Sequence, residues 1–201
     1  MSRDPIVMLD HGITDATPVE LRRALEQLPP WRKTKAESFR FLPEKMQCAQ
    51  AYLLLCRALK EHLGISAQPH FGYGPHGKPY LEEYPQIHFN LSHCKRGVLC
   101  VLSTVAPVGC DIEEIPTHVE PEVMQLCLSP QEIEQVKSAA HPGTEFAQLW
   151  TRKEALVKLS GTGLTDIDLK QLLQSPLADT TSLTTTINET LGYAMTIATP
   201  L

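Results

Sequence analysis

IHFNLSHCKRGVLCVLSTVAPVGCDI, residues 87–112, is the stretch that decides the fold. It holds three short apolar segments, which we predict to be strands at Ile87–Leu91, Gly97–Ser103 and Val108–Ile112. Only a few residues connect each segment to the next. Because parallel strands need a crossover of roughly a dozen residues or more, these connections indicate antiparallel pairing.

Helices and further strands lie on both sides of this stretch. Thr17, Pro18 and Glu20 form a capping box that opens a helix, and Ser129 with Glu132 forms a second one. We predict strands at residues 6–13, 183–187 and 193–199, helices at 18–28, 44–63 and 145–160, and a glycine- and proline-rich loop at 70–85. The two longer helices are each followed by a glycine, Gly64 or Gly161, which is typical of a helix end.

The order strand, helix, helix and strands occurs twice, once in residues 1–105 and once in residues 106–201. We therefore predict two halves, with the boundary between residues 105 and 106. The sequences of the two halves do not repeat one another, so the likeness is one of element order.

Composition narrows the class of protein. The 201 residues are 42% hydrophobic and 20% charged, with a net charge of −5, values that fit a globular protein and disfavour a nucleic-acid binder. We find no signal peptide and no membrane-spanning segment, and we expect a cytoplasmic protein. The six cysteines form no CxxC pair and no zinc-finger spacing, so we expect reduced, mostly buried thiols.

Two carboxylates stand out in the segment Val108–Glu113. Asp111 and Glu113 are two residues apart, so in a strand their side chains share one face, with Cα atoms about 7 Å apart. They repel one another unless a cation or a basic group lies between them. Oxygen ligands favour a hard cation such as magnesium. A solvated acidic edge strand is the alternative interpretation of the same pair.

A third carboxylate, Glu154, lies in the predicted helix at 145–160. It shares one stripe of that helix with Trp150 and Lys158, which are four residues away on either side. Lys153 falls within the apolar arc of the same helix. A lysine there either extends its ammonium out to solvent or meets an anion, and the second case would mark a site.

Several segments have side chains suited to binding anions. Gly77-Lys78-Pro79 places a lysine on a loop, and Ser92 with His93 ends a strand with two groups able to donate to a phosphate. Residues 31–45 carry a surplus of three positive charges, which is also the pattern of a solvated helix face. Three carboxylates could hold a divalent cation, and these basic and hydroxyl side chains could bind phosphates. Together they are side chains suited to group transfer at a diphosphate.

The sequence resembles the 4′-phosphopantetheinyl transferase family, of the longer monomeric type typified by the surfactin synthetase activator. Four motifs carry the resemblance in order along the chain: GKP (77–79), FNLSH (89–93), VGCDIE (108–113) and WTRKEALVK (150–158). The resemblance implies an α+β fold of two similar halves related by a pseudo-two-fold axis, each a small antiparallel sheet with a long helix. Coenzyme A would lie between them, with its nucleotide on the N-terminal half.

The resemblance also implies a role for each motif residue. Asp111, Glu113 and Glu154 would hold magnesium, and Lys158 and His93 would contact the diphosphate. Ser92, Lys78 and Pro79 would help to bind coenzyme A. When the chain is aligned on Phe39, Arg32 and Lys35 match basic residues that hold the nucleotide 3′-phosphate.

The implied reaction transfers 4′-phosphopantetheine from coenzyme A to a serine of an acyl or peptidyl carrier protein and releases 3′,5′-ADP. Glu154 is the candidate base, Lys158 would stabilise charge on the diphosphate, and Asp111 completes the catalytic set. We expect a monomer that binds neither nucleic acid nor membrane. The alternatives are an inactive relative that binds coenzyme A or a carrier, a magnesium-dependent phosphohydrolase, and an interaction protein.

Overall fold

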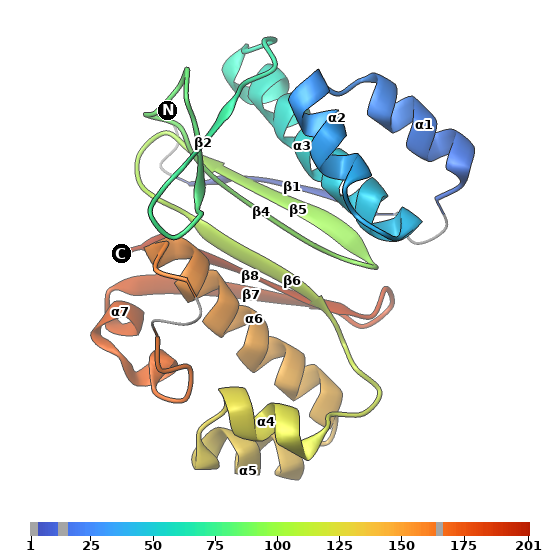
Figure 1. Ribbon diagram of the computed structural model, residues 1–201. Coiled ribbons are helices and arrows are strands. Elements are labelled where there is room, and N and C mark those ends of the chain that lie inside the picture. The colour runs from blue at the N-terminus through green and yellow to red at the C-terminus, as the bar shows by residue number, and fades with distance from the viewer. Residues whose placement is uncertain (1–3, 12–15, 164–166) are drawn as a thin grey trace.

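The computed structural model describes residues 4–11, 16–163 and 167–201 and has an α+β fold (Figure 1). Its elements in chain order are β1 (Ile6–His11), α1 (Pro18–Glu26), α2 (Pro30–Glu37), α3 (Leu42–Leu63), β2 (Phe71–Tyr73), β3 (Pro79–Leu81), β4 (His88–Cys94), β5 (Gly97–Ser103), β6 (Gly109–Glu114), α4 (Pro121–Cys127), α5 (Pro130–Ser138), α6 (Pro142–Ser160), α7 (Pro176–Asp179), β7 (Thr181–Asn188) and β8 (Tyr193–Pro200). A 3₁₀ turn spans Leu172–Gln174. No described helix has the length and the apolar character that crossing a bilayer requires.

The strands form two three-stranded antiparallel sheets, with the orders β1-β5-β4 and β6-β8-β7. In each sheet the strand that comes last in the chain lies in the middle. The antiparallel pairing of the first two predicted strands, now β4 and β5, and the late hairpin are confirmed. The third, β6, does not pair with its neighbour in the chain, β5, as the short connection had indicated, but with β8 in the other sheet. The pseudo-two-fold relation and the boundary at residues 105 and 106 stay predictions.

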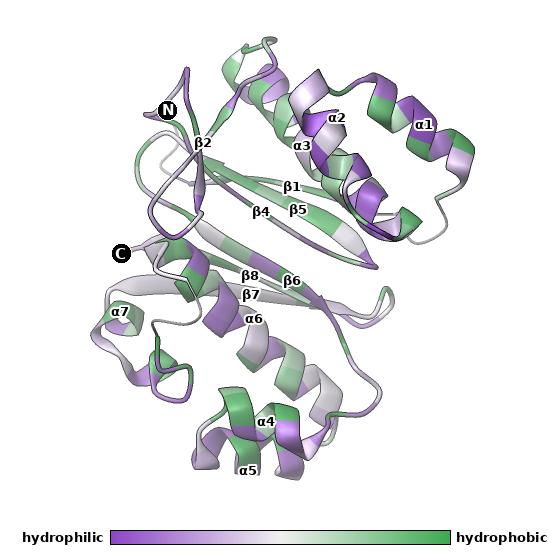
Figure 2. Ribbon diagram, viewed as in Figure 1, coloured by the Kyte–Doolittle hydropathy of each residue, from purple (hydrophilic) through white to green (hydrophobic). Residues whose placement is uncertain are grey.

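Hydrophobic side chains pack the two sheets against each other and the first sheet against the N-terminal helices. In β5, Val98, Cys100 and Leu102 pack toward α3, while Leu99 and Val101 pack toward Cys110, Ile112 and Tyr193 of the second sheet. β5 is therefore buried on both faces, and Figure 2 shows it as a hydrophobic strand inside the molecule. The resulting order is the α1–α3 layer, the first sheet, the second sheet and α6.

The local signals for helix ends are confirmed. Both capping boxes form, with Thr17 and Ser129 accepting from the N–H groups of Glu20 and Glu132. α3 and α6 end at glycines with left-handed φ angles of 69° at Gly64 and 72° at Gly161, a conformation that other residues adopt at a cost.

The prediction of a loop at residues 70–85 is wrong in part, because β2 and β3 pair there as a short hairpin. The strands have only three residues each, too few to show an alternating pattern among glycines and prolines. Residues 12 and 13 of the predicted first strand lie outside the described residues.

β6 and α6 approach each other very closely at Gly109. A Cβ atom at this position would collide with the backbone carbonyl of Ala155 and the backbone of Leu159. Glycine therefore allows the strand that carries Asp111 to lie directly against the helix that carries Glu154 and Lys158.

Candidate functional site

The two acidic segments meet where β6 lies on α6. Cys110 and Ile112 point into the layer between the sheets, and Asp111 points the other way, toward α6. Lys158 Nζ donates to Asp111 Oδ1 at 2.6 Å and lies 4.0 Å from Glu154 Oε2. The solvated-edge interpretation of Asp111 is therefore wrong, because the residue is only 1% exposed.

The negative charges of the three carboxylates act on one another. Burial, followed by the charge of Asp111, raises the pKa of Glu113 to about 7, and the charge of Glu154 adds to the rise. A hydrogen bond with the Trp150 side chain opposes it. The pKa of Glu154 is also raised, first by burial, although Lys158 acts against this. Three acids in one such region repel one another and favour a bound cation.

Lys158 is the cation already present in this cluster. Burial alone would lower its pKa, but the charge of Asp111 and the hydrogen bond to it outweigh burial, so the pKa is raised. Ser92 Oγ also donates to Asp111 Oδ1, at 2.8 Å, and Lys158 Nζ lies 3.1 Å from the same hydroxyl. The serine of FNLSH and the lysine of WTRKEALVK thus meet at one carboxylate oxygen.

The other oxygen of Asp111 bears on the predicted magnesium ion. Oδ2 is buried and accepts no hydrogen bond from any described residue, which is costly for a carboxylate oxygen. Together with the carboxylates of Glu113 and Glu154, which feel the charge of Asp111, it offers the kind of donor that suits a hard cation. In the described parts of the chain, however, no three Asp, Glu, His or Cys side chains already stand in metal-binding geometry. The residues fit the ion in chemistry, and the assignment of magnesium stays a prediction.

His93 lies within electrostatic reach of both Lys158 and Arg32. Partial desolvation, then the charge of Lys158, lowers the pKa of His93, and the charge of Arg32 contributes to this. Arg32 is only 9% exposed, donates to the carbonyl of Cys48 and lies over the rings of Tyr52 and Phe71. Lys35, by contrast, is exposed over Phe39. The basic stretch is therefore not one solvated face.

Lys78, which we expected to bind a phosphate, is bonded to backbone carbonyls of the protein. Its Nζ donates to the carbonyls of Val108 at 3.2 Å and Leu159 at 3.0 Å, so it joins the β2–β3 hairpin to β6 and α6. Burial lowers its pKa. Two of its three hydrogens are thus engaged by carbonyls of the protein.

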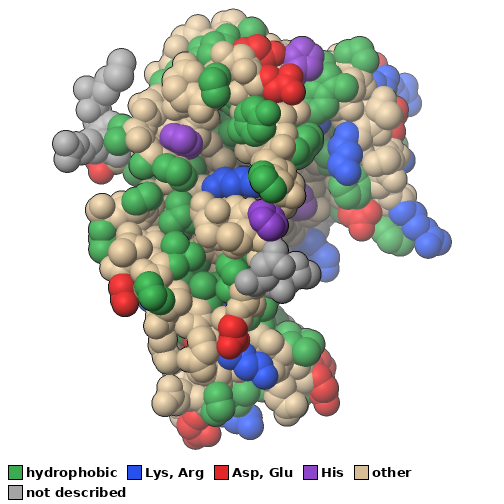
Figure 3. All heavy atoms as spheres, turned by 60° about the vertical axis from the view of Figure 1, so that its left-hand side comes forward, with side chains coloured by type: hydrophobic (Ala, Val, Ile, Leu, Met, Phe, Trp, Pro, Cys, Tyr) green, Lys and Arg blue, Asp and Glu red, His purple; other side chains and the backbone are tan. Residues whose placement is uncertain are grey.

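Two cavities flank the cluster. The first holds about 240 Å³ and is lined by His76, Gly77, Lys78, Pro79, Asn90, Leu91, Val157, Lys158, Gly161 and Gly163. The second holds about 410 Å³ and is mainly apolar, with walls that include Glu113, Cys127, Phe146 and Trp150. Figure 3 shows basic side chains set into a hollow near the middle of one face of the molecule.

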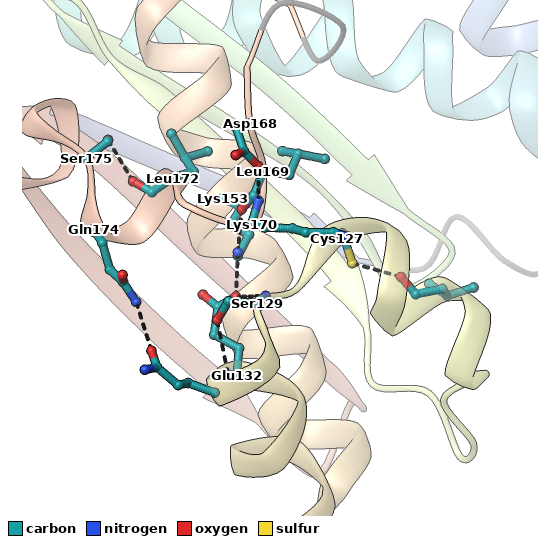
Figure 4. A network of polar contacts seen from close by, with 12 residues as sticks. Cys127, Ser129, Glu132, Lys153, Asp168, Leu169, Lys170, Leu172, Gln174 and Ser175 are labelled. Atoms are coloured by element: carbon teal, nitrogen blue, oxygen red, sulfur yellow. Dashed lines mark hydrogen bonds and ion pairs between the residues drawn. The ribbon is translucent and has the colours of Figure 1, made fainter.

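Lys153 lies outside this cluster. It is fully buried, and its Nζ donates to Glu132 Oε2 at 2.7 Å and to the carbonyl of Leu169 (Figure 4). The same Glu132 oxygen accepts from the N–H of Ser129, so the ion pair joins the first turn of α5 to α6. Of the two interpretations, extension to solvent is wrong, and the anion that Lys153 meets belongs to the protein.

The sequence analysis missed Asn90, Trp150 and Glu132 as partners in this region. Asn90 and Trp150 lie within the quoted motifs, but nothing in one sequence shows which distant group each side chain meets. Glu132 was recognised only for its capping box.

Known proteins are similar to this chain in sequence. The sequence model of the 4′-phosphopantetheinyl transferase superfamily matches residues 107–197, which include β6 and α6. The 4′-phosphopantetheinyl transferase AcpT of Salmonella typhi is 33% identical over 152 residues, 74% of each chain. The 4′-phosphopantetheinyl transferase psf-1 of Bacillus pumilus is 33% identical over 150 residues, 71% of this chain and 64% of that protein.

The 4′-phosphopantetheinyl transferase Sfp of Bacillus subtilis (strain 168) is 32% identical over 96 residues, 47% of this chain and 42% of that protein. The chain thus spans less than two thirds of the length of psf-1 and of Sfp. The match to AcpT covers most of both chains, and the motif residues of β4, β6 and α6 meet in the fold. From these observations we conclude that the chain belongs to the 4′-phosphopantetheinyl transferase superfamily.

Proposed function

We propose that this protein transfers 4′-phosphopantetheine from coenzyme A to a serine of an acyl or peptidyl carrier protein, with release of 3′,5′-ADP. Membership of the superfamily supports the reaction class. The observation that carries the proposal is the meeting of Asp111, Glu154 and Lys158, with the buried Oδ2 of Asp111 left without a donor among the described residues.

Asp111, Glu113 and Glu154 would hold magnesium, which when bound neutralises charge on the diphosphate. The charge of Lys158, 4.0 Å from Glu154 and bonded to Asp111, would stabilise the oxygens of the diphosphate as the bond breaks. His93 and Ser92 lie beside Lys158 and would complete the contacts with the diphosphate.

The nucleotide would lie along the N-terminal half. Lys78 and Pro79 line the 240 Å³ cavity beside Lys158. Arg32 and Lys35 would hold the 3′-phosphate, Arg32 from its buried position within electrostatic reach of His93. The apolar cavity beyond Glu113 has room for the uncharged pantetheine chain.

In the transfer, the oxygen of the carrier serine forms a bond to the β-phosphorus, and the bond from that phosphorus to the bridging oxygen breaks. Glu154 would take the proton of the serine. Because burial raises the pKa of Glu154, its carboxylate is a stronger base than an exposed one. Fixed positions of the reacting groups would supply much of the acceleration.

The test is the intact mass of an apo-carrier protein after incubation with the protein, coenzyme A and magnesium. We expect a gain of one phosphopantetheine, lost when the carrier serine is replaced by alanine or when magnesium is chelated. Glu154→Gln should abolish most of the gain, whereas Glu134→Gln on the exposed face of α5 should not.

Other outcomes identify the alternatives. Release of phosphopantetheine to water without a carrier would mean a phosphohydrolase. Stabilisation by coenzyme A with an unmodified carrier would mean a binding protein without transferase activity. The proposal also includes action as a monomer in the cytoplasm, and light scattering of the purified protein tests the oligomeric state.

A further inference from the structure

The edge of β6 that faces β4 is held by side chains. β6 pairs through its backbone with β8, whereas β4 pairs with β5, and the described strands contain no backbone ladder between β4 and β6. Instead, the N–H of Cys110 donates to Asn90 Oδ1 at 2.8 Å, and the N–H of Ile112 donates to Ser92 Oγ at 3.4 Å. Lys78 binds the carbonyl of Val108 along the same segment.

Asn90 makes the shorter of the two bonds from β4, and it is the better placed to set the register of β6. Its side chain is 5% exposed, and the N–H that it accepts belongs to the residue directly before Asp111. A buried N–H without an acceptor is costly, so β6 has one favoured position relative to β4. In that position Asp111 Oδ1 meets both Ser92 and Lys158.

The chemistry of an amide suits this place. Asn90 Oδ1 accepts a hydrogen bond without adding charge, whereas a carboxylate would add a fourth negative group to a region in which acids already raise the pKa of Glu113.

We propose that Asn90 is a positioning residue that fixes β6 against β4, so that the acids of β6 stand in register with Lys158 and Ser92. The inference rests on the proposed function for its consequence in catalysis. The hydrogen bond itself belongs to the protein without ligand, so it can be measured separately from the reaction.

The experiment compares Asn90→Leu, which removes the acceptor at similar volume, with Asn90→Asp, which keeps an oxygen at the same place. Amide hydrogen exchange at Cys110 is followed by NMR in the ligand-free protein. We expect exchange on the order of tenfold faster in Asn90→Leu, the change that corresponds to losing one hydrogen bond, and protection restored in Asn90→Asp. Asn90→Ala is measured in parallel, so that a folding failure of the leucine variant leaves the test intact.

A matched control removes another bond from an asparagine side chain to a backbone amide. Asn188 Oδ1 accepts from the N–H of Leu191 at the turn between β7 and β8. Asn188→Leu should speed exchange at Leu191 alone and leave transfer activity unchanged.

Transfer kinetics and coenzyme A binding complete the test. In Asn90→Leu we expect the magnesium concentration for half-maximal activity to rise several-fold and kcat to fall, with coenzyme A affinity in the absence of metal within about twofold of wild type. Unchanged exchange at Cys110 would overturn the proposal. So would a loss of coenzyme A affinity with unchanged magnesium dependence, because Asn90 would then act as a ligand contact. If wild-type protein does not modify a carrier, the proposed function fails, while the exchange result still decides whether Asn90 holds β6.

Discussion

At the scale of single residues, the two oxygens of Asp111 have different surroundings. Oδ1 accepts from Ser92 and Lys158, whereas Oδ2 is buried with no donor among the described residues. Glu113, two residues further along β6, lies in the same field of negative charge but has no lysine bonded to it among the ion pairs of the described residues. Burial, and after it the charge of Asp111, raises the pKa of Glu113, and this leads to a pH dependence.

Glu113→Gln is expected to stabilise the metal-free protein above about pH 7. Burial and neighbouring acids raise the pKa of Glu113 from 4.5 to about 7. Between these values the folded state holds a proton that the unfolded chain has lost, so stability falls as pH rises through this window. Because the side chain is only partly buried, we expect a difference of roughly 2 kcal/mol at pH 8 that vanishes below about pH 4.5. Urea unfolding of both proteins with a chelator measures it, and a pH-independent difference would contradict the assignment.

Lys78→Met separates two roles for Lys78. As a link to the carbonyls of Val108 and Leu159, the ammonium stabilises the ligand-free protein, and its loss should cost about 2 kcal/mol of unfolding free energy. If Lys78 only binds phosphate, the substitution should instead lower the affinity for coenzyme A and leave the melting temperature of the ligand-free protein unchanged. Lys60→Met, at an exposed lysine of α3, should change stability by less than about 0.5 kcal/mol.

At the scale of elements, the buried pair of Lys153 and Glu132 ties α5 to α6. Lys153→Met should destabilise the protein by about 3 to 5 kcal/mol, because it leaves the Glu132 carboxylate buried without its cation. Adding Glu132→Gln removes that charge yet keeps the capping box at Ser129, so the double variant should recover much of the loss. Urea unfolding of the four proteins gives the coupling energy, and additive effects of the two changes would show that the pair is not coupled.

Much of the element order follows from local signals in the sequence. Capping boxes, glycine stops and apolar periodicity act within a few residues, so they place α1, α3, α5 and α6 and the strands of both sheets. The β2–β3 hairpin and α4 were missed because each is short, and α4 has exposed apolar residues such as Leu126 that obscure its pattern. The partners of Asn90, Lys78 and Lys153 lie at least 16 residues away along the chain, and only the fold brings them together.

At the scale of the whole molecule, two kinds of contact join the two halves. A buried layer of apolar side chains, including Leu99, Val101 and Ile112, lies between the sheets. At its rim, Lys95 and Arg96 of the β4–β5 turn lie near Glu114, with nitrogen–oxygen distances of 3.6 and 3.2 Å. We expect the buried layer to account for most of the stability of this interface.

Glu114→Gln is accordingly expected to lower the unfolding free energy by less than about 1 kcal/mol, and by less still at about 0.5 M salt. Calorimetry should show a single transition for both proteins, because the halves share one buried layer. A second transition in the variant would mean that these rim charges hold the halves together.

The six free thiols divide among the layers of the molecule. Cys94 and Cys110 lie between the sheets, whereas Cys48 and Cys100 lie between α3 and the first sheet. Burial raises the pKa of Cys110 to about 12 and that of Cys94 to about 11, so both stay protonated and unreactive while the layer is closed. Alkylation of Cys110 ahead of Cys100 would therefore report the two sheets parting before the N-terminal helices detach. The buried cysteines are thus built-in chemical probes of the order in which the layers of the protein unfold.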